Sequence, residues 1–240
     1  MNRRSMARIA VSGAVLAALG MGVPQAVQAH TVGARFAPAV NIPSTTQAGY
    51  VLASAPTPAS AGDKFRVPTL TCPSTGNYGI AQVAFLSTSS GLTGGEVTAE
   101  CSSGTASYTG FVWENNEFVT TPFTPAAGDL IQATATETAT TANGFIRDIT
   151  QNIADGFSNS VGATTSSVLV GMTSVTGSSG TLPIPPFGIK RFFAGTIDGG
   201  TVLASGAVAE NMRTSTHVLQ IKTSALNSAG TVWREVFKHS

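Results

Sequence analysis

The sequence predicts an all-β protein built as an antiparallel β-sandwich. Three observations favour this class: about a dozen short strand-like runs, clusters of Gly, Pro, Asn, Asp and Ser between them, and helical periodicity confined to the beginning of the chain. Charged residues are only 10% of the sequence, and glycines number 26. Hydroxyl-rich strand faces explain this composition in a sandwich, and disorder is the alternative explanation. Because apolar alternation recurs along the chain, we favour the sandwich.

Apolar and polar side chains alternate most regularly in residues 130–137 and 217–222. A period of two residues places one face of a strand on a core and the other in solvent. No helical pattern separates the strand-like runs, so a parallel sheet with crossover helices is not expected.

The chain begins with MNRRSMAR, which carries three arginines, followed by the uncharged apolar run IAVSGAVLAALGMGV. This run is shorter than the ~20 residues that a membrane-spanning helix needs. Small residues precede His30, so we expect cleavage after Ala29. Residues 1–29 are therefore predicted to be a signal peptide and the protein to be secreted.

The remaining chain is predicted to form a leader and one domain. Residues 30–45 are rich in Pro and Ala without periodicity, which indicates a flexible leader. Residues 46–240 are long enough for one sandwich with its own core. This part has no apolar run near the ~20 residues of a membrane span, so no membrane association is expected after signal cleavage. The oligomeric state stays open.

The predicted mature chain is nearly neutral. Removing Arg3, Arg4 and Arg8 from 13 Lys+Arg leaves 10 against 12 Asp+Glu, a net charge of −2. The sequence shows no basic stripe or Lys/Arg-rich arm that would neutralise phosphates. A nucleic-acid partner is therefore not expected.

Cys72 and Cys101 are the two cysteines of the chain. An exported protein meets an oxidising compartment, which favours their pairing in a disulfide. A zinc site is not expected because no His lies at ligand spacing from them, and no other metal or cofactor is predicted.

Seven segments occur in a characteristic order along the predicted domain. They are TTQAGYVLAS, FRVPTLTCP, VAFLSTSSG, AECSSGTASYTGFVW, TPAAGDLIQATATE, TLPIPPFGIKRFFAGTIDG and the tail that begins AENMRTSTHVLQIKTSAL. In this order they resemble the glutamic peptidases (eqolisins), particularly the bacterial secreted branch of that family. Thr46 and Gln47 stand where the family has Asn and Trp. The resemblance implies a jelly-roll, a concanavalin-like sandwich of two large sheets with a concave substrate groove.

The resemblance also implies where the chemistry should be. In the family a glutamate acts as general base on water, and a glutamine helps to hold the oxyanion. Counting back from Cys101, the glutamine position falls at Gly94, and the glutamate position falls at Ser167. No Asp or Glu occurs between Asp155 and Asp198, so this segment has no carboxylate to act as base. Both catalytic positions are thus substituted.

Three residues remain as catalytic candidates: Glu96, Glu114 and Ser167. Glu96 lies two residues after Gly94 and therefore on the same strand face. Either glutamate could act as a base at acidic pH, and a solvated surface carboxylate is the alternative for both.

Tyr108, Phe111 and Trp113 lie on one predicted strand, on which Phe111 and Trp113 share a face. We predict that the three aromatic side chains line the groove as a stacking platform for a ligand. Packing in the core is the alternative.

Three functions remain open. The preferred one is a secreted, catalytically degenerate homologue of the glutamic peptidases whose groove binds an extended polypeptide or a glycan. The second is an active acid endopeptidase with a divergent dyad. The third is a structural or cell-surface interaction domain.

Overall fold

The structure, a computed structural model, describes residues 42–55, 59–89, 91–114, 117–120, 123–160, 165–178 and 180–239. Every regular element in these ranges is a β-strand, so the predicted all-β class is confirmed. No helix in this part of the chain is long and apolar enough to cross a membrane. The predicted signal peptide lies outside the described residues.

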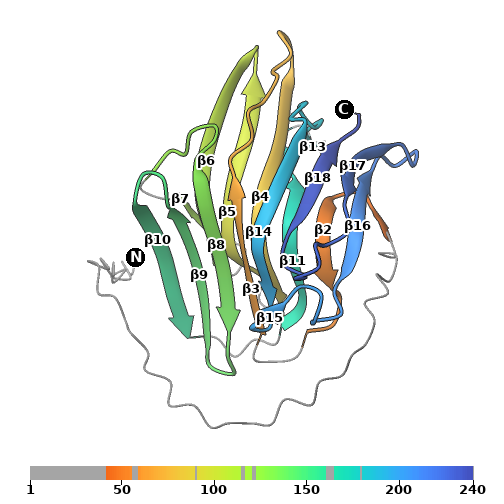
Figure 1. Ribbon diagram of the computed structural model, residues 1–240. Coiled ribbons are helices and arrows are strands. Elements are labelled where there is room, and N and C mark those ends of the chain that lie inside the picture. Colours follow the sequence, from red (N-terminus) through yellow and green to blue (C-terminus); the bar gives the residue numbers. More distant parts are fainter. Residues whose placement is uncertain are drawn as a thin grey trace. The chain divides into compact units, whose positions relative to one another are not determined.

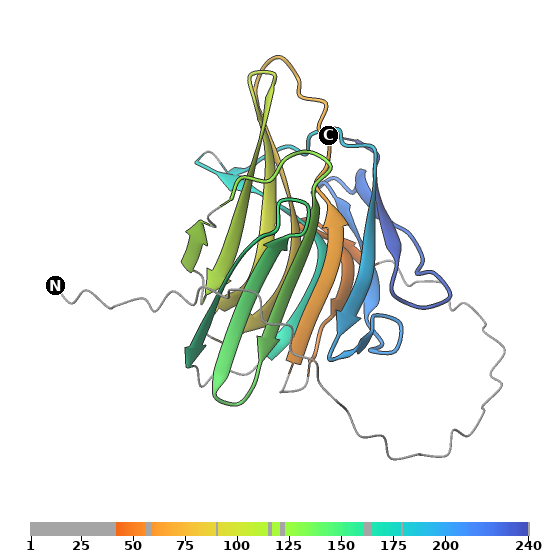
Figure 2. The same cartoon turned by 60° about the vertical axis from the view of Figure 1, so that its left-hand side comes forward.

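Two layers of strands pack face to face (Figures 1 and 2). In spatial order, the first layer consists of β16 (Val208–Arg213), β2 (Gln47–Leu52), β11 (Thr165–Ser174), β4 (Asn77–Thr88), β5 (Gly91–Ser102), β6 (Thr105–Glu114) and β7 (Glu117–Thr120). The second layer consists of β10 (Ile153–Ser160), β9 (Thr141–Asp148), β8 (Leu130–Glu137), β3 (Ala59–Arg66), β14 (Ile189–Ile197), β18 (Trp233–Phe237) and β17 (Leu219–Thr223).

The two layers are parts of one hydrogen-bonded sheet, because β16 of the first layer pairs with β17 of the second. All pairings along this path are antiparallel. The short β15 (Gly200–Thr201) extends β14, while β12 (Thr176–Gly177) and β13 (Gly180–Thr181) form a separate hairpin. The predicted sandwich of two large sheets is therefore one sheet folded over its own core.

The sheet begins earlier than the predicted domain boundary. Strand β1 (Ile42–Ser44) pairs in parallel with β16, from Ile42 opposite Glu210 to Ser44 opposite Met212. These three residues belong to the predicted flexible leader, in which Pro and Ala hide the strand pattern. The prediction of a flexible leader is wrong for them. Residues 30–41 of that leader lie outside the described part of the chain.

The core lies between the layers and is built by alternating residues. On β4, Ile80 and Leu86 are fully buried there, and Phe65, Phe192 and Trp233 fill the opposite layer. The rings of Phe192 and Trp233 stack with centroids 5.0 Å apart. Full burial of side chains of this size contributes roughly 1.5–3 kcal/mol each, so these buried side chains are a principal source of stability.

The other face of the first layer carries a second, smaller apolar cluster. Ala81, Val83 and Phe85 of β4 are buried there, although no further strand layer covers them in the part of the chain that the structure describes. The central strand β4 is thus buried on both faces. This outer face holds the candidate site.

Candidate functional site

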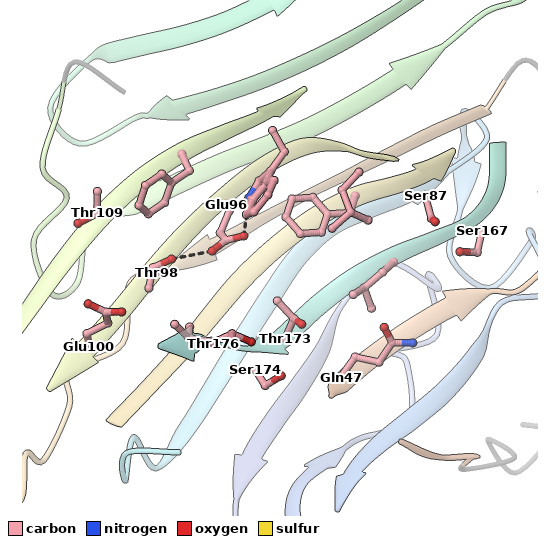
Figure 3. Close-up of a pocket in the computed structure, with 16 residues that line it drawn as sticks. Gln47, Ser87, Glu96, Thr98, Glu100, Thr109, Ser167, Thr173, Ser174 and Thr176 are labelled. Carbon is pink, nitrogen blue, oxygen red and sulfur yellow. Dashed lines mark hydrogen bonds between the residues drawn. The ribbon is translucent and has the colours of Figure 1, made fainter. Parts of the chain in front are cut away.

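A pocket of about 580 Å³ opens on the outer face of the first layer (Figure 3). Its lining comes from β2, β11, β4, β5, β6 and the residues that follow β11. Successive side chains of a strand point to opposite faces, so roughly every second residue of these strands faces the pocket. The pairing of the strands then arranges these side chains in rows across the sheet. The hydroxyl-bearing members are Ser87, Thr98, Thr109, Ser167, Thr173, Ser174 and Thr176.

One row crosses the sheet through Gly94. Leu169 of β11 lies opposite Phe85 of β4, Phe85 opposite Gly94 of β5, and Gly94 opposite Trp113 of β6. The rings of Phe85 and Trp113 meet edge to face with centroids 6.2 Å apart. Because Gly94 has no side chain, its two neighbours close the row over it.

The backbone at Gly94 has no room for a side chain. An ideal Cβ on this residue would lie 2.0 Å from the carbonyl oxygen of Ala84 and 2.8 Å from Cδ1 of Phe85. Its φ of +152° is also a value that residues with side chains rarely adopt. The position to which the resemblance assigns a glutamine is therefore specific for glycine in this chain.

Glu96 occupies the next row, between Val83 of β4 and Phe111 of β6. Its side chain is only 7% exposed. Thr98 Oγ1 donates to its Oε1 at 2.6 Å, and Trp113 Nε1 donates to its Oε2 at 2.7 Å (Figure 3). Both carboxylate oxygens thus have a protein donor, which fixes the orientation of the group.

Burial raises the pKa of Glu96 above its usual value. The hydrogen bonds from Thr98 and Trp113 stabilise the ionised form and offset part of the rise, while the charge of Glu100 adds to it. A carboxyl group with these neighbours is protonated at a higher pH than an exposed glutamate.

The lining is acidic. Glu96 and Glu100 belong to it, and in the described part of the chain no Lys, Arg or His does. Gln47, at the far side of the pocket, donates from Nε2 to Glu210 at 2.8 Å. The pocket therefore offers hydroxyls, an amide and two carboxyl groups beside aromatic rings.

Ser167 lines the same pocket but lies far from Glu96. It pairs with Ser87 at one end of β11, whereas the β11 residue in the row of Glu96 is Gly171. Four residues along the strands and two strand spacings separate the two residues, which amounts to roughly 17 Å. Glu96 and Ser167 thus do not form a pair that could act on one bond.

Phe111 and Trp113 lie on the pocket face, but two other predicted site residues do not. Tyr108 packs against the core between the layers. Glu114 is also on the opposite face from Trp113, and its side chain accepts a hydrogen bond from Asn159. The assignments of Tyr108 to the groove and of Glu114 to the site are wrong, because both differ from Trp113 by an odd number of residues.

The predicted disulfide is present. Cys72, which lies between β3 and β4, is bonded to Cys101 near the end of β5, with Cα atoms 5.4 Å apart. The bond anchors the strand that carries Gly94 and Glu96. In the described residues no group of three or more His, Cys, Asp or Glu side chains could hold a metal ion.

Several pocket residues carry no recognisable motif in the sequence. Phe85, Thr98 and Thr173 were not singled out because an isolated Thr or Phe on a strand carries no motif. The available signal is the alternation of side chains along a strand, since Thr98 shares one face of β5 with Glu96 and Phe85 of β4 lies opposite Gly94 on that face.

Solved structures similar to this chain are glutamic peptidases. Scytalidoglutamic peptidase superposes with a TM-score of 0.62 at 15% identity over 81% of this chain and 100% of its own. SCP-B, a member of the eqolisin family, gives a TM-score of 0.60 at 15% identity over 81% and 100%. The aspergilloglutamic peptidase of Aspergillus niger gives 0.55 at 14% identity over 67% and 99%.

At these identities the comparison shows the fold, which is that of the glutamic peptidases. No family model matches the sequence, and no curated protein matches it.

Proposed function

We propose that this protein is a degenerate homologue of the glutamic peptidases whose pocket binds an extended polypeptide without hydrolysing it. The observation that carries the proposal is Gly94. The glutamine that the resemblance places there cannot be accommodated, because its Cβ would lie 2.0 Å from the Ala84 carbonyl oxygen.

The pocket supports binding of a polypeptide. Hydroxyl groups along β11 and β5 can bond to peptide N–H and C=O groups, and Phe111 and Trp113 offer apolar surface for side chains. Among proteins of this fold, scytalidoglutamic peptidase has been solved with a peptide-based transition-state analogue and SCP-B with the tripeptide Ala-Ile-His. Both the pocket lining and the ligands of these two proteins are consistent with an extended peptide as the ligand.

Hydrolysis lacks support because the pocket does not combine an available general base with donors for the oxyanion. A general base needs an accessible lone pair near the attacked carbonyl, and the developing oxyanion needs donors. Both oxygens of Glu96 already accept hydrogen bonds, and strand β11 (Thr165–Ser174) carries no carboxylate.

An acid endopeptidase that uses Glu96 as base is the second candidate. One observation favours it: Glu96 lies within the pocket. Because burial raises the pKa of its carboxyl group, only the ionised fraction of Glu96 could act as base in acid. A base of raised pKa takes up a proton more readily once it is ionised. Ser167 is roughly 17 Å from it by strand geometry, so this candidate would need a different partner.

One pair of assays separates the two candidates. The purified protein is incubated with a denatured protein substrate at pH 2–5, and the products are analysed by mass spectrometry. In parallel, fluorescence anisotropy measures binding of labelled peptides, with neutral oligosaccharides as competitors. We expect saturable peptide binding, no cleavage, and at least tenfold weaker binding for Phe111→Ala.

The matched control is Glu117→Gln, which removes an exposed carboxylate of β7 that does not line the pocket. It should bind peptide as the unaltered protein does. Cleavage that disappears in Glu96→Gln and persists in Glu117→Gln would establish the peptidase instead. Displacement of the peptide by oligosaccharide would assign the pocket to glycans.

Export of the protein belongs to the same proposal. The Cys72–Cys101 disulfide supports an oxidising compartment, where such bonds persist. Mass spectrometry of the protein from the culture medium should find an N-terminus at His30. Recovery of the full-length chain from the cytoplasm alone would contradict export.

A further inference from the structure

A pair of arginines lies on the second layer, away from the pocket. Arg191 of β14 and Arg234 of β18 are directly opposite each other in the strand register, and both side chains are exposed. They share the outer face because their neighbours Phe192 and Trp233 point into the core.

The two charges are uncompensated. Like charges directly opposite on neighbouring strands destabilise a sheet. Neither guanidinium forms an ion pair with a carboxylate among the residues that the structure describes. Glu235, the acid adjacent in sequence, is completely buried on the other face and is held by Trp233 and Thr223. Among the described residues, no carboxylate therefore offsets the repulsion.

Local contacts fix the side chain of Arg191 and the backbone of Arg234. The guanidinium of Arg191 lies over the ring of Phe193, 5.1 Å from its centroid, an arrangement that fixes a cation on an aromatic face. The backbone of Arg234 is tied to Ser224 by two hydrogen bonds, from Arg234 N to Ser224 Oγ and from Ser224 N to Arg234 O, at 2.9 and 2.8 Å. The like-charged pair is therefore built into the sheet.

Both arginines line an open depression of about 370 Å³ beside the loop that joins β17 to β18. Asn227 lines it as well, and its Oδ1 accepts from Thr231 N and Val232 N at 2.9 and 3.0 Å. This fixes the amide group and leaves its Nδ2 as a donor. No acidic residue is found in the described lining.

We infer that Arg191 and Arg234 form a binding site for a phosphate group. Each guanidinium presents a planar fork of N–H donors that matches two oxygens of a phosphate. A phosphate ester with a charge of −1.5 to −2 at pH 7 balances the two cations, whereas one carboxylate balances only half of their charge. Asn227 Nδ2 supplies a neutral donor at the edge.

Titration calorimetry with inorganic phosphate and with methyl phosphate tests the site at pH 7 and low ionic strength. The expected result is saturable binding with one site per chain, weakened at least tenfold in Arg191→Gln and in Arg234→Gln. Binding of both compounds indicates a site for phosphate esters, and binding of inorganic phosphate alone indicates a site for the free anion.

The matched control is Arg147→Gln, which removes an exposed arginine of β9 that does not line the depression. It should leave phosphate binding unchanged. Without phosphate, Arg234→Gln should unfold at a higher temperature than the unaltered protein because the repulsion is gone. Absence of saturable binding, or equal weakening by all three substitutions, would overturn the inference. The proposal concerns another face and does not depend on peptide binding in the pocket.

Discussion

Gly94 stands where the sequence resemblance to the glutamic peptidases assigns a glutamine, and the structure leaves no room for a side chain there. We expect Gly94→Gln to destabilise the protein by about 3 kcal/mol or more, because overpacking and a forced φ both act against the new side chain. The Cβ would meet the Ala84 carbonyl oxygen, which belongs to a paired strand and cannot move alone. Urea denaturation followed by fluorescence measures the loss.

Gly128→Ala is the control for this substitution. Gly128 also has a positive φ, +93°, but nothing lies within 4 Å of its ideal Cβ. Only backbone strain acts there, and the expected cost is about 1 kcal/mol. If both variants lose equal stability, the steric explanation for Gly94 is wrong.

Trp113 controls the ionisation of Glu96. Its indole N–H donates to Glu96 Oε2 at 2.7 Å and so stabilises the ionised form. Trp113→Phe removes this donor, and the pKa of Glu96, already raised by burial, should rise further. A ¹³C NMR titration of the glutamate side chains measures the shift.

Phe111→Leu is the comparison, since it changes the cross-strand neighbour of Glu96 and keeps the indole donor. It should shift the pKa of Glu96 less than Trp113→Phe does. An unchanged or lowered pKa in Trp113→Phe would show that the indole does not stabilise the carboxylate.

At the scale of elements, the disulfide secures strand β5. It closes a sequence separation of 29 residues between Cys72 and Cys101. Replacing both cysteines by Ala should lower the free energy of unfolding by roughly 3–4 kcal/mol, chiefly because the unfolded chain gains freedom. Urea unfolding of the double variant measures the change, and two free thiols in the unaltered protein under mass spectrometry would contradict the bond.

Strand patterns were predictable where alternation is long. Residues 130–137 were predicted as a strand, and β8 has the bounds Leu130–Glu137. The run 217–222 was predicted less well, since β17 begins only at Leu219. His217 instead lies in a turn with a φ of 68°, and its N–H donates to the Thr214 carbonyl. The hydrogen-bonded turn from Thr214 to His217 therefore replaces the start of the predicted strand.

The site was predictable from the sequence only as far as the alternation of side chains along one strand allows. Glu96, Phe111 and Trp113 share a pocket because the register places their strands together, and Tyr108 could have been excluded on this alternation alone. The pairing of Arg191 with Arg234 depends on two strands more than forty residues apart in the sequence. Such an arrangement leaves no local pattern.

At the scale of the whole domain, an unusual share of the acidic side chains is buried. Burial raises the pKa of Asp63, Glu137 and Glu235. It also raises that of Asp148, where neighbouring Asp129 contributes further, while the pKa of Asp129 is lowered. Folding therefore favours the protonated form of most of these groups.

The hydrogen bonds around Glu235 are consistent with a protonated carboxyl group. Thr223 Oγ1 lies 2.9 Å from Glu235 Oε2 and also contacts the carbonyl oxygen of Glu210, while accepting from Gly49 N at 3.0 Å. The single hydroxyl hydrogen of Thr223 cannot serve both oxygens. If it is donated to Glu210, a protonated Glu235 donates to Thr223 and every group is satisfied.

These buried carboxyl groups predict a protein that is most stable in acid. The pKa of Glu235 is raised from 4.5 to about 8, so the folded chain retains a proton that the unfolded chain releases between these pH values. Stability from this group is complete below about pH 4.5 and is lost as the pH rises toward 8, by at most roughly 5 kcal/mol. Calorimetric melting from pH 4 to 9 should show a falling transition temperature.

The variant Glu235→Gln identifies the group responsible. The amide keeps the shape of the side chain, accepts from Trp233 and donates to Thr223, but it does not titrate. Its melting temperature should therefore fall less steeply between pH 5 and 8 than that of the unaltered protein. A transition temperature that rises with pH over this range would refute the assignment, because a proton held only in the folded state must make folding weaker as protons become scarce.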